Sequence, residues 1–121
     1  MKYLLDTQIL IWILYSPSRI SSKNRYLIDN AESLFVSTLS IFEILHKKKI
    51  GKLEFEYDLE EFEFFEWLDL KRDHILYTND LPLIHRDPFD RLIMAQSIIE
   101  SIPLITSDKK IQQYDFPHVK A

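Results

Sequence analysis

The chain has 121 residues, of which 46% are apolar, enough for one domain (1–121) with a buried core. It has no cysteine, which excludes disulfides, thiolate metal sites and thiol nucleophiles. The formal net charge of −4 argues against a broadly basic nucleic-acid-binding surface, although a basic rim around an acidic centre is compatible with it. No apolar run is long enough to cross a bilayer, so we expect a cytoplasmic protein without membrane contact.

The first half of the chain alternates between short apolar runs and helical patterns. Residues 2–5 predict a buried strand that ends at Asp6, and residues 7–15 predict a helix. A second helix follows, then a strand, then a third helix; their expected ranges are 21–31, 34–38 and 40–49. Gly51, the only glycine, stands where a left-handed residue is expected after a helix.

The second half continues this alternation. Its most definite helix begins with Pro88 at a first helical position and runs to about residue 100. The segment at 73–79 is ambiguous between strand and helix, and its flanking residues favour a helix. The other expected elements are helices at 58–65 and 109–114 and strands at 67–70, 104–106 and 118–120.

Strands that alternate with helices predict an α/β fold, with a central parallel sheet covered by helices on both faces. In such sheets, functional sites form beyond the carboxyl ends of the strands. Asp6 and Asp108 both fall at such ends.

The motif Asp87-Pro88-Phe89-Asp90 places two carboxylates at the start of a helix, and it has two interpretations. Asp87 as N-cap, Pro88 at the first position and Asp90 near the positive end of the dipole make a good helix start. Carboxylates gathered from the ends of several elements are also what a hard divalent cation requires. Asp6 and Asp108, each taken alone, are explained equally well as helix caps.

Glu43 is harder to explain by capping, because it lies inside a predicted helix between apolar neighbours. A buried carboxylate needs a partner, since an unpaired one costs several kcal/mol. Lys47, one turn further on, and a bound metal are the two candidates. The four histidines are scattered without metal-ligand spacing, so an oxygen-ligand site for Mg²⁺ or Mn²⁺ is the metal site to expect.

The chain resembles the PIN-domain family, and specifically the VapC-type toxins of toxin–antitoxin pairs. The resemblance covers nearly the whole chain in order and spacing, and its most specific string is His85-Arg86-Asp87-Pro88-Phe89-Asp90-Arg91. The other matching segments are Leu4-Leu5-Asp6-Thr7, residues 36–44 with Lys47 and Gly51-Lys52-Leu53, Leu81-Pro82, Ala95-Gln96 and residues 104–108.

The resemblance implies a three-layer α/β/α sandwich and a metal-dependent endoribonuclease that hydrolyses RNA phosphodiester bonds with a metal-activated water. It also implies a VapB-like cognate antitoxin and a homodimer. Carried over by position, the catalytic set is Asp6, Glu43, Asp90 and Asp108. The metal, Mg²⁺ or Mn²⁺, would be held by Asp6, Asp90 and Asp108, with Glu43 and Asp87 contributing directly or through water.

Two positions depart from the family pattern: Gln8 replaces a common histidine, and Phe42 replaces a common tryptophan. Neither change removes a carboxylate. A phosphoryl-transfer domain of the receiver or haloacid-dehalogenase type would need a second aspartate near Asp6, where Gln8 stands. A non-catalytic antitoxin- or nucleic-acid-binding module and a nuclease acting on structured DNA remain as alternatives.

Basic residues beside the acids are candidates for RNA phosphate contacts, namely Lys47, Arg86, Arg91 and Lys109. Residues 53–67 are unusually rich in aromatic side chains. Core packing explains most of them, and the excess predicts a surface for a dimer partner or an antitoxin helix.

Overall fold

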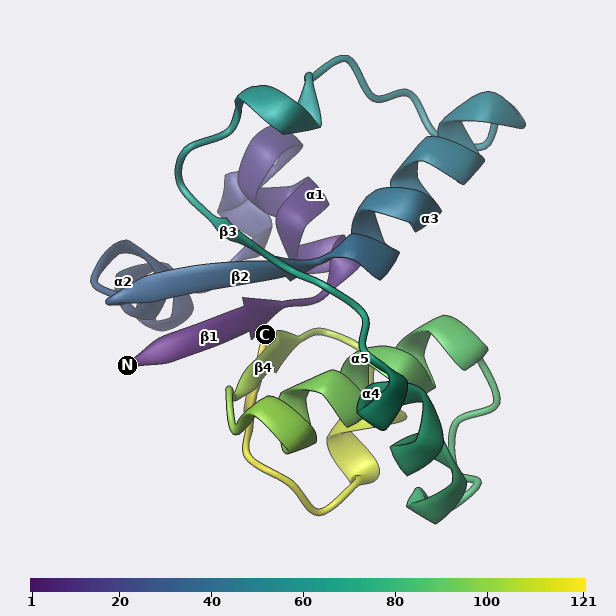
Figure 1. Ribbon diagram of the computed structural model, residues 1–121. Coiled ribbons are helices and arrows are strands. Elements are labelled where there is room, and N and C mark those ends of the chain that lie inside the picture. The colour runs from purple at the N-terminus through teal and green to yellow at the C-terminus, as the bar shows by residue number, and fades with distance from the viewer.

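A computed structural model of all 121 residues contains a central sheet of five parallel strands (Figure 1). Their order in the sheet is β3-β2-β1-β4-β5. The bounds are β1 (Lys2–Leu5), β2 (Ser33–Ser37), β3 (Glu66–Leu68), β4 (Leu104–Thr106) and β5 (His118–Lys120). The predicted parallel sheet is therefore confirmed.

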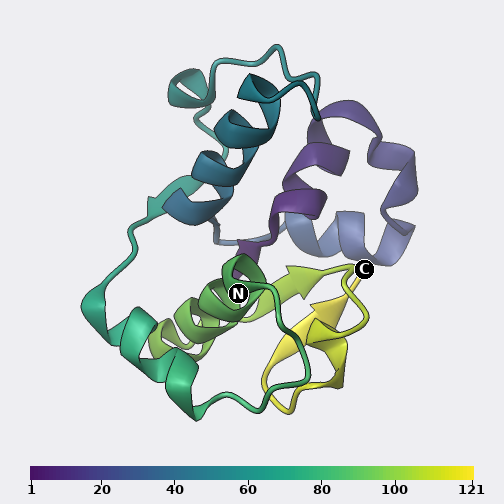
Figure 2. The ribbon, with the colours of Figure 1, turned by 90° about the vertical axis from the view of Figure 1, so that its right-hand side faces the viewer.

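Helices cover both faces of the sheet, which completes the predicted three-layer sandwich (Figures 1 and 2). On one face lie α1 (Thr7–Tyr15) and α3 (Thr38–Lys49), with α2 (Ser22–Asp29) packed against the same core. On the other face lie α4 (Arg72–Tyr77) and α5 (Pro88–Glu100). No helix of the structure has the length and apolar character needed to span a bilayer.

The strand β1 explains how one sheet serves two cores. Tyr3 and Leu5 point into the core shared with α1 and α3, while Leu4 points into the core shared with α5. Alternation along a strand sends successive side chains to opposite faces, and all three residues are buried. A continuous apolar run is therefore required here, as is typical of strands in parallel sheets.

Helix ends follow the local signals of the sequence. Asp87 caps α5 through its side chain, Pro88 takes the first helical position, and Gly51 adopts φ +78° just after α3. The start of α3 differs from the expected residue 40, because Ser37 accepts a hydrogen bond from the Leu39 N–H and caps the helix earlier.

The helix predicted at 58–65 is wrong. Only the short 3-10 turn Leu59–Glu61 forms, and the rest of the segment is irregular. Its rings Phe62, Phe64 and Phe65 pack against one another, with Phe64 edge to face against Phe62 and Phe65. Ring contacts of this kind bury aromatic surface without a helix, so the aromatic spacing does not require a helical conformation here.

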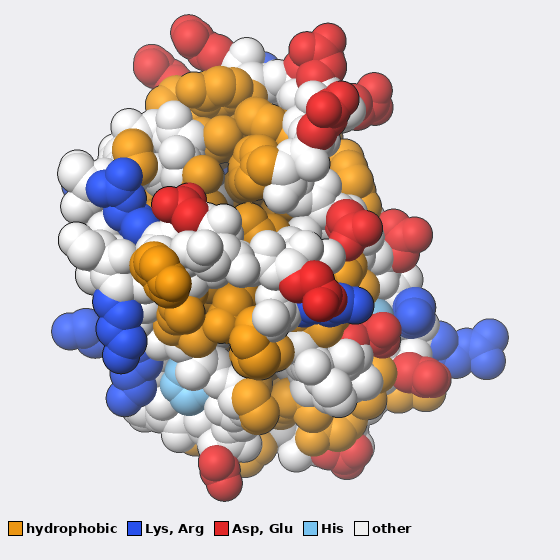
Figure 3. All heavy atoms as spheres, turned by 90° about the vertical axis from the view of Figure 1, so that its left-hand side faces the viewer, with side chains coloured by type: hydrophobic (Ala, Val, Ile, Leu, Met, Phe, Trp, Pro, Cys, Tyr) orange, Lys and Arg blue, Asp and Glu red, His pale blue; other side chains and the backbone are white.

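The carboxyl ends of the strands all lie at one edge of the sheet, and Figure 2 looks onto that edge. There α1 and α3 lie above the edge and the first turn of α5 lies below it. Figure 3 shows the side of the molecule at the opposite edge of the sheet, where the strands begin. Acidic side chains are scattered among apolar ones there. The strand order reverses direction around β1, and this is where α/β sheets form binding crevices.

Candidate active site

A cavity of about 300 Å³ opens at this carboxyl edge, and carboxylates from four parts of the chain line it. Asp6 follows β1, Glu43 lies in α3, Asp87 and Asp90 begin α5, and Asp108 follows β4. The rest of its lining is Thr7, Gln8, Ile11, Lys47 and Ser107. Acids that are far apart in the sequence thus face one small space.

Asp6 is buried, with 5% of its surface exposed, and its side chain is held at both oxygens. Oδ1 accepts a hydrogen bond from the Ile9 N–H at 2.8 Å, which caps α1, and Oδ2 accepts one from the Thr106 hydroxyl at 2.5 Å. Burial raises the pKa of Asp6 to about 6, although these hydrogen bonds oppose the shift. Asp6 therefore acts as a cap and still carries a poorly solvated charge.

Asp90 is the most perturbed acid of the cavity. Burial, followed by repulsion from Asp87, raises its pKa to about 7, and only His85 among its close neighbours opposes the shift. Asp108 and Glu43 add further repulsion. At neutral pH this carboxyl group stays partly protonated unless a cation compensates the negative charge.

Asp87 and Asp108 are both held by backbone N–H groups. Asp87 Oδ1 accepts hydrogen bonds from Phe89 and Asp90, so the capping interpretation of this residue is correct. Asp108 Oδ1 accepts hydrogen bonds from Lys110 and Ile111. Burial would raise the pKa of Asp108, but the hydrogen bonds from Ile111 and His85 outweigh it and lower the pKa below its usual value.

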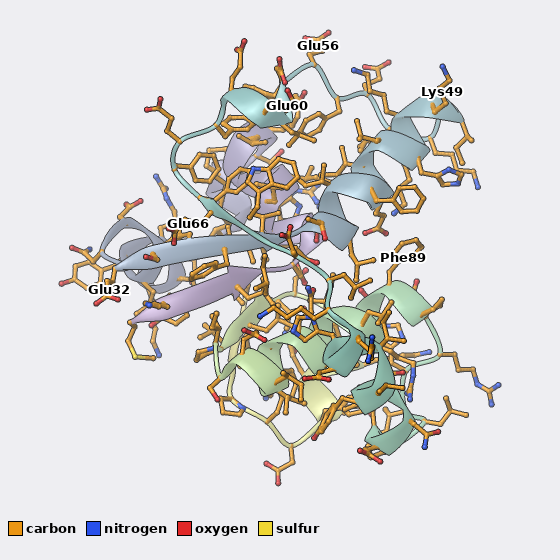
Figure 4. All side chains as sticks on the ribbon, in the orientation of Figure 1. Glu32, Lys49, Glu56, Glu60, Glu66 and Phe89 are labelled. Atoms are coloured by element: carbon orange, nitrogen blue, oxygen red, sulfur yellow. The ribbon has the colours of Figure 1, made fainter.

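Glu43 pairs with Lys47 across one helical turn, with Nζ 3.1 Å from Oε2, and both residues line the cavity. The apolar surroundings expected for Glu43 are found only in part, because Ile41 and Ile44 are buried but Phe42 and Leu45 are 57% and 53% exposed. Phe42 instead contacts Phe89, labelled in Figure 4 at the start of α5, and the two ring centroids are 6.2 Å apart. Glu43 therefore faces the cavity rather than the core.

His85 belongs to this site, although no role for it was predicted from the sequence. Its Nε2 lies 3.1 Å from Asp108 Oδ2 and 2.9 Å from Asp90 Oδ2, and the residue is only 8% exposed. Its place two residues before Asp87 in the specific motif is the one signal that could have drawn attention to it.

The four basic residues predicted to bind RNA fall into two groups. Lys47, Arg86 and Lys109 are exposed; Lys47 lines the cavity, and the other two directly adjoin lining residues in the sequence. The guanidinium of Arg91 instead donates hydrogen bonds to the backbone oxygens of the preceding loop, at Thr78, Leu81, Pro82 and His85. These contacts occupy Arg91, so we remove it from the RNA-binding set and assign it to holding the 78–85 loop.

The residues of the cavity fit a hard divalent cation. Carboxylate oxygens are the ligands that Mg²⁺ and Mn²⁺ prefer, and five carboxylates line the cavity against one basic side chain, Lys47. Burial is the first cause of the raised pKa values of Asp6 and Asp90, and repulsion from neighbouring carboxylates adds to it.

Comparisons with known proteins bear on the family and the fold. The chain is 24% identical to Ribonuclease VapC22 of Mycobacterium tuberculosis, over 94% of this chain and 92% of that protein. Its structure resembles VapBC2 from Rickettsia felis bound to a promoter DNA fragment (TM-score 0.71, 18% identity, 100% of this chain and 99% of the other). It also resembles a toxin–antitoxin complex from Klebsiella pneumoniae (TM-score 0.70, 18% identity, 98% and 96%). The PIN domain model matches residues 3–117, and the chain therefore belongs to the PIN domain family.

Proposed function

We propose that the protein is a metal-dependent endoribonuclease and the toxin of a VapBC-type pair. The observation that carries the proposal is the convergence of Asp6, Glu43, Asp90 and Asp108 on one cavity. The similarity to Ribonuclease VapC22 supports RNA as the substrate. The proposed chemistry depends on how these side chains bind a metal ion and orient a water molecule.

Asp6, Asp90 and Asp108 would hold Mg²⁺ or Mn²⁺, with Glu43 and Asp87 contributing directly or through water. A bound divalent ion supplies positive charge that stabilises the phosphoryl oxygens and makes water more acidic. The hydrogen bonds to Asp6 and Asp108 fix those carboxylates before substrate arrives.

Glu43 and Lys47 complete the proposed chemistry from the α3 side of the cavity. The Glu43 carboxylate can accept a hydrogen bond from a water molecule and orient it toward a phosphate. Lys47, beside it, can contact the phosphate oxygens. Because water rather than the ribose 2′-hydroxyl attacks, the products carry 5′-phosphate and 3′-hydroxyl ends.

The first test is cleavage of a mixed, end-labelled RNA pool by the purified protein with Mg²⁺, Mn²⁺ or EDTA. We expect cleavage with either metal, none with EDTA, and products that can be ligated through their 5′-phosphates. Cleavage should weaken steeply with salt, because phosphate contacts release counterions. Equal cutting in EDTA, or 2′,3′-cyclic phosphate ends, would contradict the mechanism.

The same assay, together with a Mn²⁺ titration of the protein, separates the two alternatives. A nuclease for structured DNA would cut hairpin or duplex DNA in preference to the RNA pool under the same metals. A non-catalytic module would cut neither substrate and would bind no Mn²⁺ at the acidic cavity.

The antitoxin is proposed to use a second groove, of about 430 Å³, between α3 and the segment that follows it. Apolar side chains form its floor, and Leu45 and Trp67 are 53% and 42% exposed. Glu56, Asp58 and Glu60 lie along its rim, and Figure 4 shows Glu56 and Glu60 at the outer end of the molecule. An amphipathic helix with apolar anchors and basic flanks complements such a groove.

Co-purification with candidate antitoxins from the same genome tests this groove. Leu45→Asp and Trp67→Asp should each weaken the complex at least about 10-fold, because they place a charge against the apolar anchors. The cavity variant Asp90→Asn serves as the control and should keep the partner. If the groove instead joins two copies of this chain, the same two variants would convert a dimer to a monomer in light scattering, and the antitoxin assignment would fail.

A further inference from the structure

We propose that His85 is a positioning residue for the metal site: it stays outside the coordination sphere and holds Asp90 and Asp108 in their binding geometry. The inference rests on the proposed function, since it concerns the same site. It is carried by the hydrogen bonds on the two ring nitrogens, by the burial of the ring and by its place behind the carboxylates.

The two ring nitrogens of His85 have different partners, and these partners fix the tautomer. Nδ1 accepts a hydrogen bond from the Asp87 backbone N–H at 3.2 Å, so Nδ1 carries no proton. The single proton of the neutral ring therefore sits on Nε2, which faces Asp108 at 3.1 Å and Asp90 at 2.9 Å. A nitrogen that carries its proton has no lone pair to offer a metal ion.

The position of the ring leads to the same conclusion. His85 is buried and is absent from the residues that line the cavity, whereas Asp90 and Asp108 both line it. The imidazole thus lies behind the two carboxylates as seen from the cavity. It contacts one oxygen of each, Oδ2 in both cases, and places a polarised N–H between two groups that repel each other.

The backbone of His85 is held as firmly as its ring. The Tyr114 hydroxyl accepts a hydrogen bond from the His85 N–H at 2.7 Å, and Arg91 donates one to the His85 carbonyl oxygen at 3.2 Å. The same hydroxyl donates to Pro82 O at 2.5 Å. Hydrogen bonds therefore hold both the backbone and the ring of His85. Such rigidity is expected of a residue that orients metal ligands, because that orientation affects the metal affinity.

The chain contains a matched control in His74. Its Nδ1 also accepts a backbone N–H, from Lys71 at 3.0 Å, and its Nε2 also contacts a carboxylate, Glu100 Oε2 at 2.9 Å. His74 is fully buried, but neither it nor Glu100 lines the acidic cavity. Replacing His74 removes an equivalent structural contact without touching the proposed metal ligands.

The test measures Mn²⁺ affinity by the electron paramagnetic resonance signal of free Mn²⁺, in protein whose folding is checked by circular dichroism. We expect His85→Ala to weaken binding by about 10- to 100-fold, the usual effect of removing a partner of a metal ligand. His85→Gln keeps an N–H donor near the carboxylates and should recover most of the affinity. His74→Ala should lower thermal stability and leave the Mn²⁺ affinity within about twofold of wild type.

Nitrogen-15 spectra of the histidine rings supply a second readout. The Nε2–H tautomer of His85 should be present without metal and should persist when Mg²⁺ is added. A switch to the Nδ1–H tautomer on metal addition would identify the ring as a ligand and overturn the proposal.

Three results of the binding experiment would also overturn it. They are unchanged affinity in folded His85→Ala, equal loss of affinity in His74→Ala, and failure of folded His85→Gln to recover binding. Absence of Mn²⁺ binding in the wild-type protein would be a different failure, because it would remove the proposed metal site itself and the role of His85 with it.

Discussion

Replacing Asp90 with asparagine is expected to lower RNA cleavage at least about 100-fold while it stabilises the metal-free protein. Asparagine keeps the shape of the side chain but removes the charge that the cavity needs for a cation. The same charge is unfavourable in the metal-free fold, where burial and Asp87 raise the pKa of Asp90 to about 7. A neutral replacement removes that cost, and we expect a gain of about 1–3 kcal/mol in the free energy of unfolding.

Urea denaturation at pH 8 in EDTA measures the stability, and cleavage of labelled RNA with Mn²⁺ measures the activity. Asp115→Asn is the control, because Asp115 is exposed and lines a different cavity, and it should change neither quantity appreciably. A loss of stability in Asp90→Asn would show that the carboxylate supports the fold, and unchanged cleavage would remove Asp90 from the active site.

The metal-free protein is expected to be less stable at pH 8 than at pH 5, and a divalent ion should remove the difference. Asp6 and Asp90 have pKa values of about 6 and 7 in the folded protein, against 3.8 when unperturbed. The folded state therefore binds these two protons more tightly than the unfolded state does. The stability that this contributes is fully present below pH 3.8 and is lost as the pH rises through 6 and 7. The expected loss is about 2–4 kcal/mol between pH 5 and pH 8.

A metal ion binds the ionised acids, so its stabilising effect should grow over the same interval. Saturation at about 100 times the dissociation constant corresponds to about 2.7 kcal/mol. Chemical denaturation at pH 5 and pH 8, in EDTA and in Mn²⁺, gives all four values. The Asp90→Asn variant should show a flatter pH profile than wild type. Stability that rises from pH 5 to pH 8 without metal would contradict the burial of these two acids as ionisable groups.

Features set by neighbouring residues were predictable from the sequence. The start of α5 at Asp87 and Pro88 and the left-handed Gly51 depend on backbone groups within a few residues, and both were predicted correctly. The apolar run of β1 could be recognised because both faces of a parallel strand are buried. The positions of Asp6 and Asp108 at strand ends followed from the same pattern.

Features that depend on distant partners were predicted poorly. The aromatic spacing at 58–65 has a helical appearance, but its rings pack against one another from an irregular chain and only a short 3-10 turn forms. Arg91 looked like an RNA contact from its position between acids, and only the folded loop offers the carbonyl oxygens that occupy it. Glu43 has apolar neighbours in sequence, two of which turn out to face solvent.

The sequence by itself determined the alternation of strands and helices, the acids at their ends and the family resemblance. Only the tertiary structure decided that these acids share one cavity, and that His85 lies behind Asp90 and Asp108. The physical reason is the strand order, which pairs β1 with β4 and so lets Thr106 donate a hydrogen bond to Asp6 across 100 residues of chain. Local propensities act over a few residues, whereas such pairing is set by the packing of two cores on one sheet.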